Sequence, residues 1–230
     1  MLEFTVADRV GTLVIRRPEA GNAFTAAMAR ELGDCMKRAA ETADILELTG
    51  AGADFTIGRD RHEPKQGTPF EAFQPISEGN AAIAAFPGVL IAKVRGRALG
   101  FGVGLVLRSD LAFVADDARF GLDEVAHGIP PMFIMEAMAG RMPPKRALDI
   151  VLSGREFGAP EALDMGIASQ VVPASSLDAT VAAFIASLRG KDRRVVRACK
   201  QYLRAVSAMP AEARQAFALI EQARFAQSKD

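Results

Sequence analysis

Short β-branched runs alternate with stretches of helical periodicity along the first half of the chain, and this alternation narrows the possible folds more than any other feature. A helix is predicted over residues 25–40, where Met28, Leu32 and Met36 recur at helical spacing. Strands are predicted at 12–16, 45–49, 90–94 and 111–115. Strands separated by helices favour parallel crossover units. From about residue 131 onward there is hardly any strand signal, so we expect an α/β body followed by a helical region.

Composition limits the classes of partner. The chain has 230 residues, with 28 Lys and Arg against 28 Asp and Glu, so it lacks the basic excess that is typical of duplex-binding proteins. The first residues do not resemble a signal peptide, and no apolar run is long enough to span a bilayer. With two isolated cysteines and two histidines, neither a disulfide framework nor a metal site is expected. We therefore predict a cytoplasmic protein with no metal, no nucleic-acid partner and no membrane partner.

Two polar segments have ordinary interpretations. Residues 61–75 contain several prolines and a glycine, and we expect them to form a surface loop. The basic run over 189–204 is expected to be the solvated face of a helix, although Lys200 is its best candidate for contacting a nucleotide phosphate.

Two glycine-rich turns carry the functional signal, because each follows a different predicted strand. The first, 54–60 (DFTIGRD), follows the strand at 45–49, and the second, 95–110, follows the strand at 90–94. Glycines let a backbone approach a ligand closely, and a helix start leaves N–H groups free for a developing negative charge. Tight packing alone would also explain the glycines. A dinucleotide-binding loop is disfavoured, because that fingerprint normally follows the first strand of the chain.

Five segments in a fixed order resemble the crotonase family, that is, the enoyl-CoA hydratase/isomerase superfamily. The resemblance covers about 10–206, which is most of the chain. The segments are RRPEAGNAF (16–24), LTGAGADFTIGRD (48–60), VRGRALGFGVGL (94–105), ARFGLDEVAHGIPP (118–131) and EALDMGIASQVVP (161–173). Each is weak alone, but together they are specific.

This resemblance implies an architecture. We expect a crotonase-like α/β core built as a spiral of ββα units, occupying residues 1–173 and holding the acyl-CoA site. Residues 174–230 should form a helical region for trimerisation, with the family's last helix truncated. A homotrimer or hexamer is implied. Coenzyme A enters as part of the substrate, and no separate cofactor is expected.

The resemblance also implies roles for particular residues. The backbone N–H groups of Arg59 and Phe101 correspond to the oxyanion hole, and Glu124 corresponds to a catalytic glutamate. The predicted substrate and CoA-binding residues are Arg17, Glu19, Ala20, Gly58, Asp60 and Gly100. No residue is assigned to a metal.

One departure from the family bears on the chemistry. Family hydratases carry two glutamates, and the first of the two positions is Gly104 in this chain. Hydration is well served by two carboxylates, whereas moving a double bond needs a single group that takes and returns a proton. Glu124 has apolar neighbours in the sequence, which should raise its pKa. On local pattern alone, a surface glutamate that caps a helix is an equal alternative.

The sequence therefore predicts an acyl-CoA enzyme, preferably an enoyl-CoA double-bond isomerase. The alternatives are a hydratase of the same family, an acyl-CoA-binding protein with little catalysis and, from another branch of the family, an RNA-binding protein. The balanced charge counts against the last of these.

Overall fold

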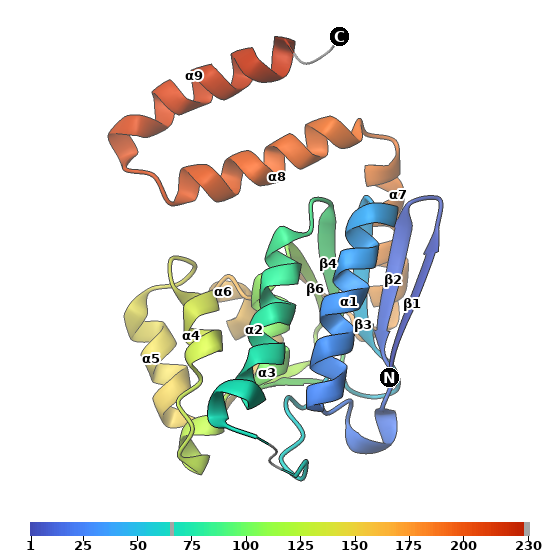
Figure 1. Ribbon diagram of the computed structural model, residues 1–230, viewed down its shortest axis with the longest axis vertical. Helices are drawn as coiled ribbons and strands as arrows, with labels where there is room; N and C mark the ends of the chain where they lie inside the picture. The colour runs from blue at the N-terminus through green and yellow to red at the C-terminus, as the bar shows by residue number, and fades with distance from the viewer. Residues whose placement is uncertain (65–66, 228–230) are drawn as a thin grey trace.

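The core is built on two β-sheets with helices packed around them (Figure 1). The computed structural model describes residues 1–64 and 67–227. The larger sheet has the order β1-β2-β3-β4-β6-β9. Its strands are β1 (Leu2–Ala7), β2 (Val10–Ile15), β3 (Ile45–Gly50), β4 (Val89–Val94), β6 (Leu111–Ala115) and β9 (Gln170–Val172). The smaller sheet has the order β5-β7-β8, formed by β5 (Arg97–Leu99), β7 (Arg119–Gly121) and β8 (Glu156–Gly158).

Parallel pairing dominates the larger sheet. Only β1 runs antiparallel, against β2, and the pairs from β2 through β9 are all parallel. Parallel strands need crossovers, which the helices supply. In Figure 1, α1 (Ala26–Thr42) and α2 (Pro69–Ala85) lie side by side in front of the sheet, and α7 (Leu177–Arg189) contacts β4 and β6. The central strand β4 is almost wholly buried, as expected for a parallel strand covered on both faces.

The predicted α/β body is confirmed. Thr25 caps α1 by accepting a hydrogen bond from the Met28 N–H at 3.2 Å, and β6 spans the predicted residues. The expectation of hardly any strand beyond residue 131 was wrong for β8 and β9. Each has three residues and pairs with a strand far away in the sequence, so neither produces a local pattern.

The loop predicted over 61–75 is shorter than expected. The helix α2 begins at Pro69, because Thr68 and Glu71 form a capping box, and Pro75 lies inside the helix. The Thr68 N–H donates to Glu71 Oε2 at 2.7 Å, which fixes this start. Residues 65 and 66 of the predicted loop lie outside the described part of the chain.

Shorter helices connect the sheets, and two long ones project from the core. The remaining helices are α3 (Phe101–Arg108), α4 (Met132–Met138), α5 (Pro144–Ser153), α6 (Ala159–Asp164), α8 (Arg193–Ser207) and α9 (Ala211–Gln227), with 3₁₀ turns η1 (Pro18–Ala20), η2 (Glu124–His127) and η3 (Ala174–Ser176). Figure 1 shows α8 and α9 above the core, where they run in opposite directions. Tyr202 of α8 stacks on Phe217 of α9 with 5.5 Å between the ring centroids. The division into domains at residue 173 stays a prediction.

The basic run on α8 is not a solvated face throughout. The Lys200 side chain is only 8% exposed and pairs with Asp110 at 2.6 Å. Its ammonium also donates to the carbonyl oxygens of Phe86 at 2.8 Å and Gly88 at 2.5 Å. Lys200 therefore anchors α8 to the start of β4, and the expectation that the basic run is a solvated face was wrong at this residue. In the described residues no helix combines the length and apolar character needed to cross a bilayer.

Candidate functional site

The two glycine-rich turns lie side by side at the carboxyl ends of β3 and β4. Thr56 of the first turn pairs in parallel with Ala98 of the second. The Thr56 N–H donates to the Arg97 oxygen at 3.0 Å, and the Leu99 N–H donates to the Thr56 oxygen at 2.9 Å. Beyond this bridge the turns stay close at Gly58, the residue that directly precedes Arg59. A Cβ atom built on Gly58 would lie 3.4 Å from the Phe101 nitrogen, so the two backbones are in close contact.

The N–H groups of Arg59 and Phe101 have no acceptor among the described residues. Phe24 donates to the Gly58 oxygen and accepts from the Asp60 N–H, both at 2.8 Å, so the N–H of the intervening Arg59 points away from Phe24. Phe101 is the first residue of α3, where backbone N–H groups lack a helical partner. Two free donors on adjacent segments are what an oxyanion requires.

Gly100 keeps the space beside these donors open. Its φ of 50° is a conformation that side-chain-bearing residues rarely adopt. A Cβ atom built on Gly100 would lie 2.6 Å from Glu124 Oε1. The Glu124 carboxylate therefore reaches the residue that immediately precedes Phe101.

Pairing between short strands brings Glu124 to this position. The strand β7 lies parallel to β5, and the Gly100 N–H donates to the Gly121 oxygen at 2.9 Å. Glu124 begins η2 directly after β7. Its Oε2 atom is shielded from solvent and has no hydrogen-bond partner among the described groups. Burial raises the pKa of the Glu124 carboxyl, with a smaller contribution from the charge of Asp123.

Neighbouring charges are bound to each other rather than to Glu124. Arg61 pairs with Asp123, and its Nη1 atom lies 2.5 Å from His127 Nε2. Asp123 and His127 are 3.5 Å apart. This cluster holds the segment after the first turn against η2 and gives Asp123 a partner of its own.

A guanidinium occupies the region next to Gly104, where a second carboxylate would be expected. A Cβ atom on Gly104 would lie 3.5 Å from Arg108 Nη1. The Arg108 side chain is 9% exposed, donates to the Phe133 oxygen at 2.6 Å and pairs with Glu136 at 2.5 Å. Sequence reasoning missed Arg108, although its position four residues after Gly104 on one helix was a usable signal.

The predicted substrate and CoA-binding residues fall into two groups. Gly58 lies in the first turn and Gly100 in the second. A Cβ atom built on Gly100 would lie 3.9 Å from the Gly58 Cα atom. Arg17 pairs with Asp60 at 2.6 Å, and the Arg17 guanidinium holds the pKa of that carboxyl below its usual value.

Glu19 and Ala20 lie in η1, beside the first turn, where the Ile57 N–H donates to the Gly21 oxygen at 3.0 Å. Glu19 is exposed and Ala20 is half-buried. Arg59 extends its side chain over the Phe73 ring of α2, with 5.5 Å from the guanidinium carbon to the centroid. In the described part of the chain, no three His, Cys, Asp or Glu side chains gather as metal ligands would.

Known proteins resemble this chain over most of its length. The family model described as enoyl-CoA hydratase/isomerase matches residues 6–230. Hydroxycinnamoyl-CoA hydratase-lyase of Pseudomonas fluorescens is 30% identical over 206 residues, which are 85% of this chain and 75% of that protein. The 1,2-epoxyphenylacetyl-CoA isomerase of Escherichia coli is 31% identical over 196 residues, which are 77% of this chain and 72% of that protein.

Solved structures share the whole architecture. A Thermobifida fusca YX protein crystallised in complex with CoA superposes with a TM-score of 0.90 at 27% identity, covering 98% of this chain and 93% of that one. The crotonase-like fold predicted from the sequence is therefore confirmed. The chain belongs to the enoyl-CoA hydratase/isomerase family.

Proposed function

We propose that this protein is an enoyl-CoA double-bond isomerase, in which the N–H groups of Arg59 and Phe101 stabilise a thioester enolate and Glu124 carries the proton. The observation that carries the proposal is the Glu124 carboxylate, whose shielded Oε2 has no partner among the described groups and whose Oε1 faces Gly100. A carboxylate oxygen that is shielded from water and has no hydrogen-bond partner is costly, and chemistry explains it better than packing does.

The oxyanion hole supplies most of the transition-state stabilisation in this proposal. Removing a proton from the carbon beside a thioester places negative charge on the carbonyl oxygen. Two fixed N–H donors aimed at that oxygen stabilise the charge, and loss of one such donor typically costs about 3 kcal/mol of transition-state stabilisation. Both donors are backbone groups, one in the half-buried first turn and one at the buried start of α3, so neither depends on a side-chain rotamer.

The proton transfers are assigned to one carboxylate. Glu124 removes the proton from C2 of a 3-enoyl thioester, and the electron pair of the broken C–H bond moves onto the thioester oxygen. The resulting dienolate takes the proton back from Glu124 at C4, which leaves the double bond between C2 and C3. The burial that raises the pKa of Glu124 suits a group that must both accept and return a proton. No cofactor is required other than the CoA that the substrate carries.

The CoA portion is assigned to the outer turn residues. Arg17, Glu19, Ala20 and Asp60 would lie along it, with Gly58 and Gly100 beside the thioester. The relative from T. fusca holds CoA, which supports a CoA site in this fold, and the relative from E. coli carries an isomerase name.

A hydratase is the second candidate, because relatives such as the P. fluorescens protein carry hydratase names. Hydration is favoured by a second carboxylate that positions water. Here Gly104 and the Arg108 guanidinium occupy that region, and Asp123 is bound to Arg61. An acyl-CoA-binding protein with little catalysis is the remaining alternative.

Exchange of the α-proton for deuterium tests the proposal, because it reports enolate formation before any product forms. Glu124→Gln should lower exchange and 3-enoyl-CoA isomerisation by about 10²- to 10⁴-fold while CoA affinity is retained. Asp123→Asn, a change at the adjacent carboxylate, should keep most of the activity.

Full activity in Glu124→Gln would refute the role of Glu124. Tight CoA binding by the unmodified protein without exchange on any enoyl-CoA would favour the binding protein. Faster hydration of 2-enoyl-CoA than isomerisation of 3-enoyl-CoA would favour the hydratase.

A further inference from the structure

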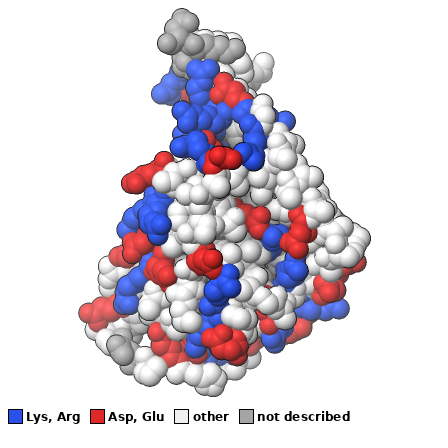
Figure 2. Space-filling view, turned by 90° about the vertical axis from the view of Figure 1, so that its right-hand side faces the viewer, with Lys and Arg blue, Asp and Glu red and all other residues white. Residues whose placement is uncertain are grey.

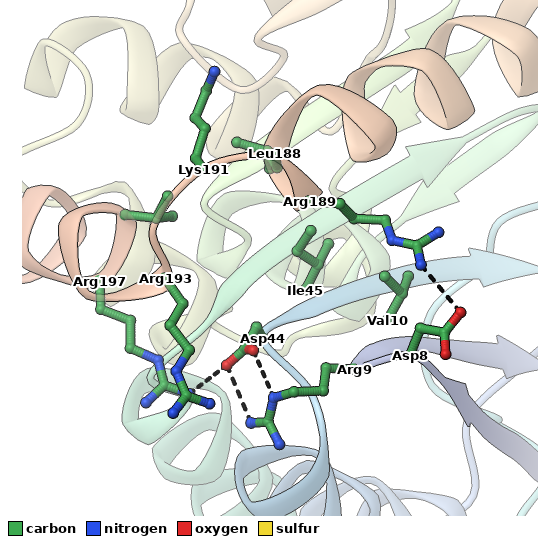
Figure 3. A pocket seen from close by; sticks show the side chains of 11 residues that line it. Asp8, Arg9, Val10, Asp44, Ile45, Leu188, Arg189, Lys191, Arg193 and Arg197 are labelled. Carbon is green, nitrogen blue, oxygen red and sulfur yellow. Dashed lines mark hydrogen bonds and ion pairs between the residues drawn. The ribbon is translucent and has the colours of Figure 1, made fainter.

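A cavity lies at the amino ends of β2 and β3, away from the candidate active site at the carboxyl ends of β3 and β4 (Figure 3). It is bordered by the turn between β1 and β2, the beginning of β3 and the junction between α7 and α8. The glycine-rich turns leave from the carboxyl ends of β3 and β4, whereas this cavity adjoins the residues where β2 and β3 begin. The six-residue strand β3 separates the two regions by about 20 Å. The cavity volume is about 350 Å³, near the lower end for small-ligand sites.

The lining of this cavity is strongly basic. Its positive side chains are Arg9, Arg189, Lys191, Arg193 and Arg197, and its carboxylates are Asp8 and Asp44. Five positive charges against two negative charges leave a net charge of +3 in a chain whose overall net charge is zero. Figure 2 shows Lys and Arg side chains gathered on this side of the molecule where the core meets the C-terminal helices. A concave surface of one sign concentrates its potential and attracts oppositely charged ligands.

Both carboxylates are already neutralised by arginines of the same cavity. Asp44 accepts from Arg9 at 2.6 and 3.1 Å and from Arg197 at 2.6 Å. The Arg9 hydrogen bond lowers the pKa of the Asp44 carboxyl, which is therefore ionised at neutral pH. Asp8 accepts from Arg189 at 3.1 Å. These pairs connect the β1–β2 turn to the C-terminal helices, and they account for three of the five positive groups.

The remaining donors have no structural partner among the described residues. Neither Lys191 nor Arg193 forms an ion-pair contact there, although the charge of Arg193 also helps to lower the pKa of Asp44, and both side chains are exposed. The Nε atom of Arg197 is shielded from solvent and has no acceptor among the described groups, although the other end of that guanidinium is bound to Asp44. Ion pairing between the elements explains Arg9, Arg189 and Arg197, but it does not explain Lys191, Arg193 or the free Nε.

The start of α8 adds to the positive electrostatic potential of the cavity. This helix has 15 residues and begins at Arg193, with Asp192 as its N-cap accepting from the Arg194 N–H at 2.8 Å. The N-terminal end of a helix carries partial positive charge, which favours an anion nearby. Figure 3 shows Arg193 and Arg197 extending from this helix towards Asp44 and Arg9.

We propose that this cavity binds a ligand with two or more linked phosphate groups. A net charge of +3 suits a multiply charged anion better than a single carboxylate, and guanidinium groups match the geometry of phosphate oxygens. The small volume fits a diphosphate group, from a nucleotide or from free pyrophosphate. This site is separate from the proposed thioester site and does not depend on the reaction proposed there.

Calorimetry with inorganic pyrophosphate at low ionic strength tests this proposal on the full-length chain. We expect Lys191→Ala combined with Arg193→Ala to weaken pyrophosphate binding at least tenfold, since both groups are exposed and have no described partner whose loss would unfold the protein. The matched control is Arg30→Ala combined with Lys37→Ala, which removes the same charge from exposed positions on α1 and should leave binding unchanged. Thermal melting checks that both variants fold.

Two further ligands identify the source of the phosphates. Equal affinity for ADP and pyrophosphate would support recognition of the diphosphate alone, and tighter ADP binding would support a nucleotide ligand. The proposal is overturned if the unmodified protein gives no heat with millimolar pyrophosphate, or if the cavity variant binds as well as the control. It is also overturned if the cavity variant loses CoA affinity as much as pyrophosphate affinity, because the cavity would then belong to the CoA site.

Discussion

Glu124 and Gly100 depend on each other at the scale of single residues. The carboxylate can approach the second turn only because position 100 lacks a side chain, since a Cβ atom there would lie 2.6 Å from Oε1. The approach also places Oε2 where water does not reach it. An ionised carboxylate is disfavoured in such surroundings, which is the physical cause of its raised pKa.

The raised pKa of Glu124 predicts the acidic limb of the pH–rate profile. Proton removal requires the ionised carboxylate, so kcat/KM should fall as the pH drops through the pKa of the folded protein. That fall should occur at a higher pH than for an ordinary glutamate, whose reference pKa is 4.5. The residual rate of Glu124→Gln should lack this limb. A profile of the unmodified enzyme that stays flat down to pH 4.5 would contradict the assignment.

The same group predicts a pH-dependent difference in stability. Because the folded pKa of Glu124 is raised, the folded protein holds its proton to higher pH than the unfolded chain does, and the free energy of unfolding decreases as the pH rises from the unfolded pKa to the folded pKa. Glu124→Gln lacks this titration. Urea unfolding should therefore show the Gln variant gaining stability relative to the unmodified protein as the pH rises through that window. If the difference in free energy of unfolding between the Gln variant and the unmodified protein stays constant from pH 4 to pH 8, Glu124 is not desolvated.

Substitution of Gly100 tests whether Glu124 needs the space that the missing side chain leaves. Gly100→Ala should reduce kcat by displacing Glu124 and should destabilise the protein by about 1–3 kcal/mol through backbone strain. Gly140→Ala is the matched control, because Gly140 also has a positive φ of 75° but has nothing within 4 Å of its Cβ position. The control should lose a similar amount of stability from strain alone while keeping its activity. Equal activities in steady-state assays of both variants would mean that the space at Gly100 does not matter.

At the scale of elements, the helix α3 packs through Gly102, where a side chain would not fit, whereas Gly104 has space for a methyl group. A Cβ atom on Gly102 would lie 2.8 Å from Thr56 Cγ2 and 2.9 Å from the Thr56 oxygen, so the helix rests directly on the first turn. At Gly104 the nearest atoms are 3.5 Å away, which is ordinary contact. The helix start that offers the Phe101 N–H is therefore fixed by contact between the two turns.

This difference predicts opposite results for two substitutions on one helix. Gly102→Ala should destabilise the protein by about 1–3 kcal/mol, because backbone atoms cannot yield easily to an added methyl group. Gly104→Ala should be neutral or stabilising by up to about 1 kcal/mol, since alanine is the better helix former. Chemical denaturation measures both changes. Equal destabilisation by the two substitutions would contradict the described packing of α3.

At the scale of the whole molecule, α8 and α9 extend away from the core with much of their apolar surface uncovered. Leu203 is 65% exposed, Leu219 is 73% exposed and Ile220 is 61% exposed. None of the residues of α9 is buried. Several large apolar side chains left exposed on one pair of helices are consistent with an association surface, and the resemblance to the crotonase family implies a trimer or hexamer.

Charged substitutions on α9 test that prediction. Light scattering after size exclusion should give about three or six times the 24.5 kDa chain mass for the unmodified protein. Leu219→Glu combined with Ile220→Glu should shift it towards the monomer, because two charges would be buried without partners. The control, Gln215→Glu combined with Gln222→Glu, adds the same charge at exposed polar positions and should keep the assembly. A monomeric unmodified protein would refute the predicted assembly.

Local chemistry explains why much of this molecule was predictable from its sequence. The start of α1 follows from Thr25 and its body from helical periodicity, and β6 follows from a short run of apolar residues. The positions of both glycine-rich turns, and of Glu124 as the candidate carboxylate, were also visible without a structure. Local patterns missed the three-residue strands β8 and β9, because pairing with distant strands stabilises them. The start of α2 at Pro69 was missed although its capping box, Thr68 and Glu71, is a local signal.

The sequence alone determined the alternation of strands and helices in the first half of the chain, the two glycine-rich turns and the presence of one carboxylate instead of two. These properties depend on residues that are neighbours along the chain. Only the tertiary structure decided that Gly58 lies against the Phe101 backbone, that Oε2 of Glu124 is shielded from water, that Arg108 lies close to Gly104 and that Lys200 is buried against Asp110. Each of these depends on strand pairing or helix docking between distant segments, and such distances are set by packing of the whole chain.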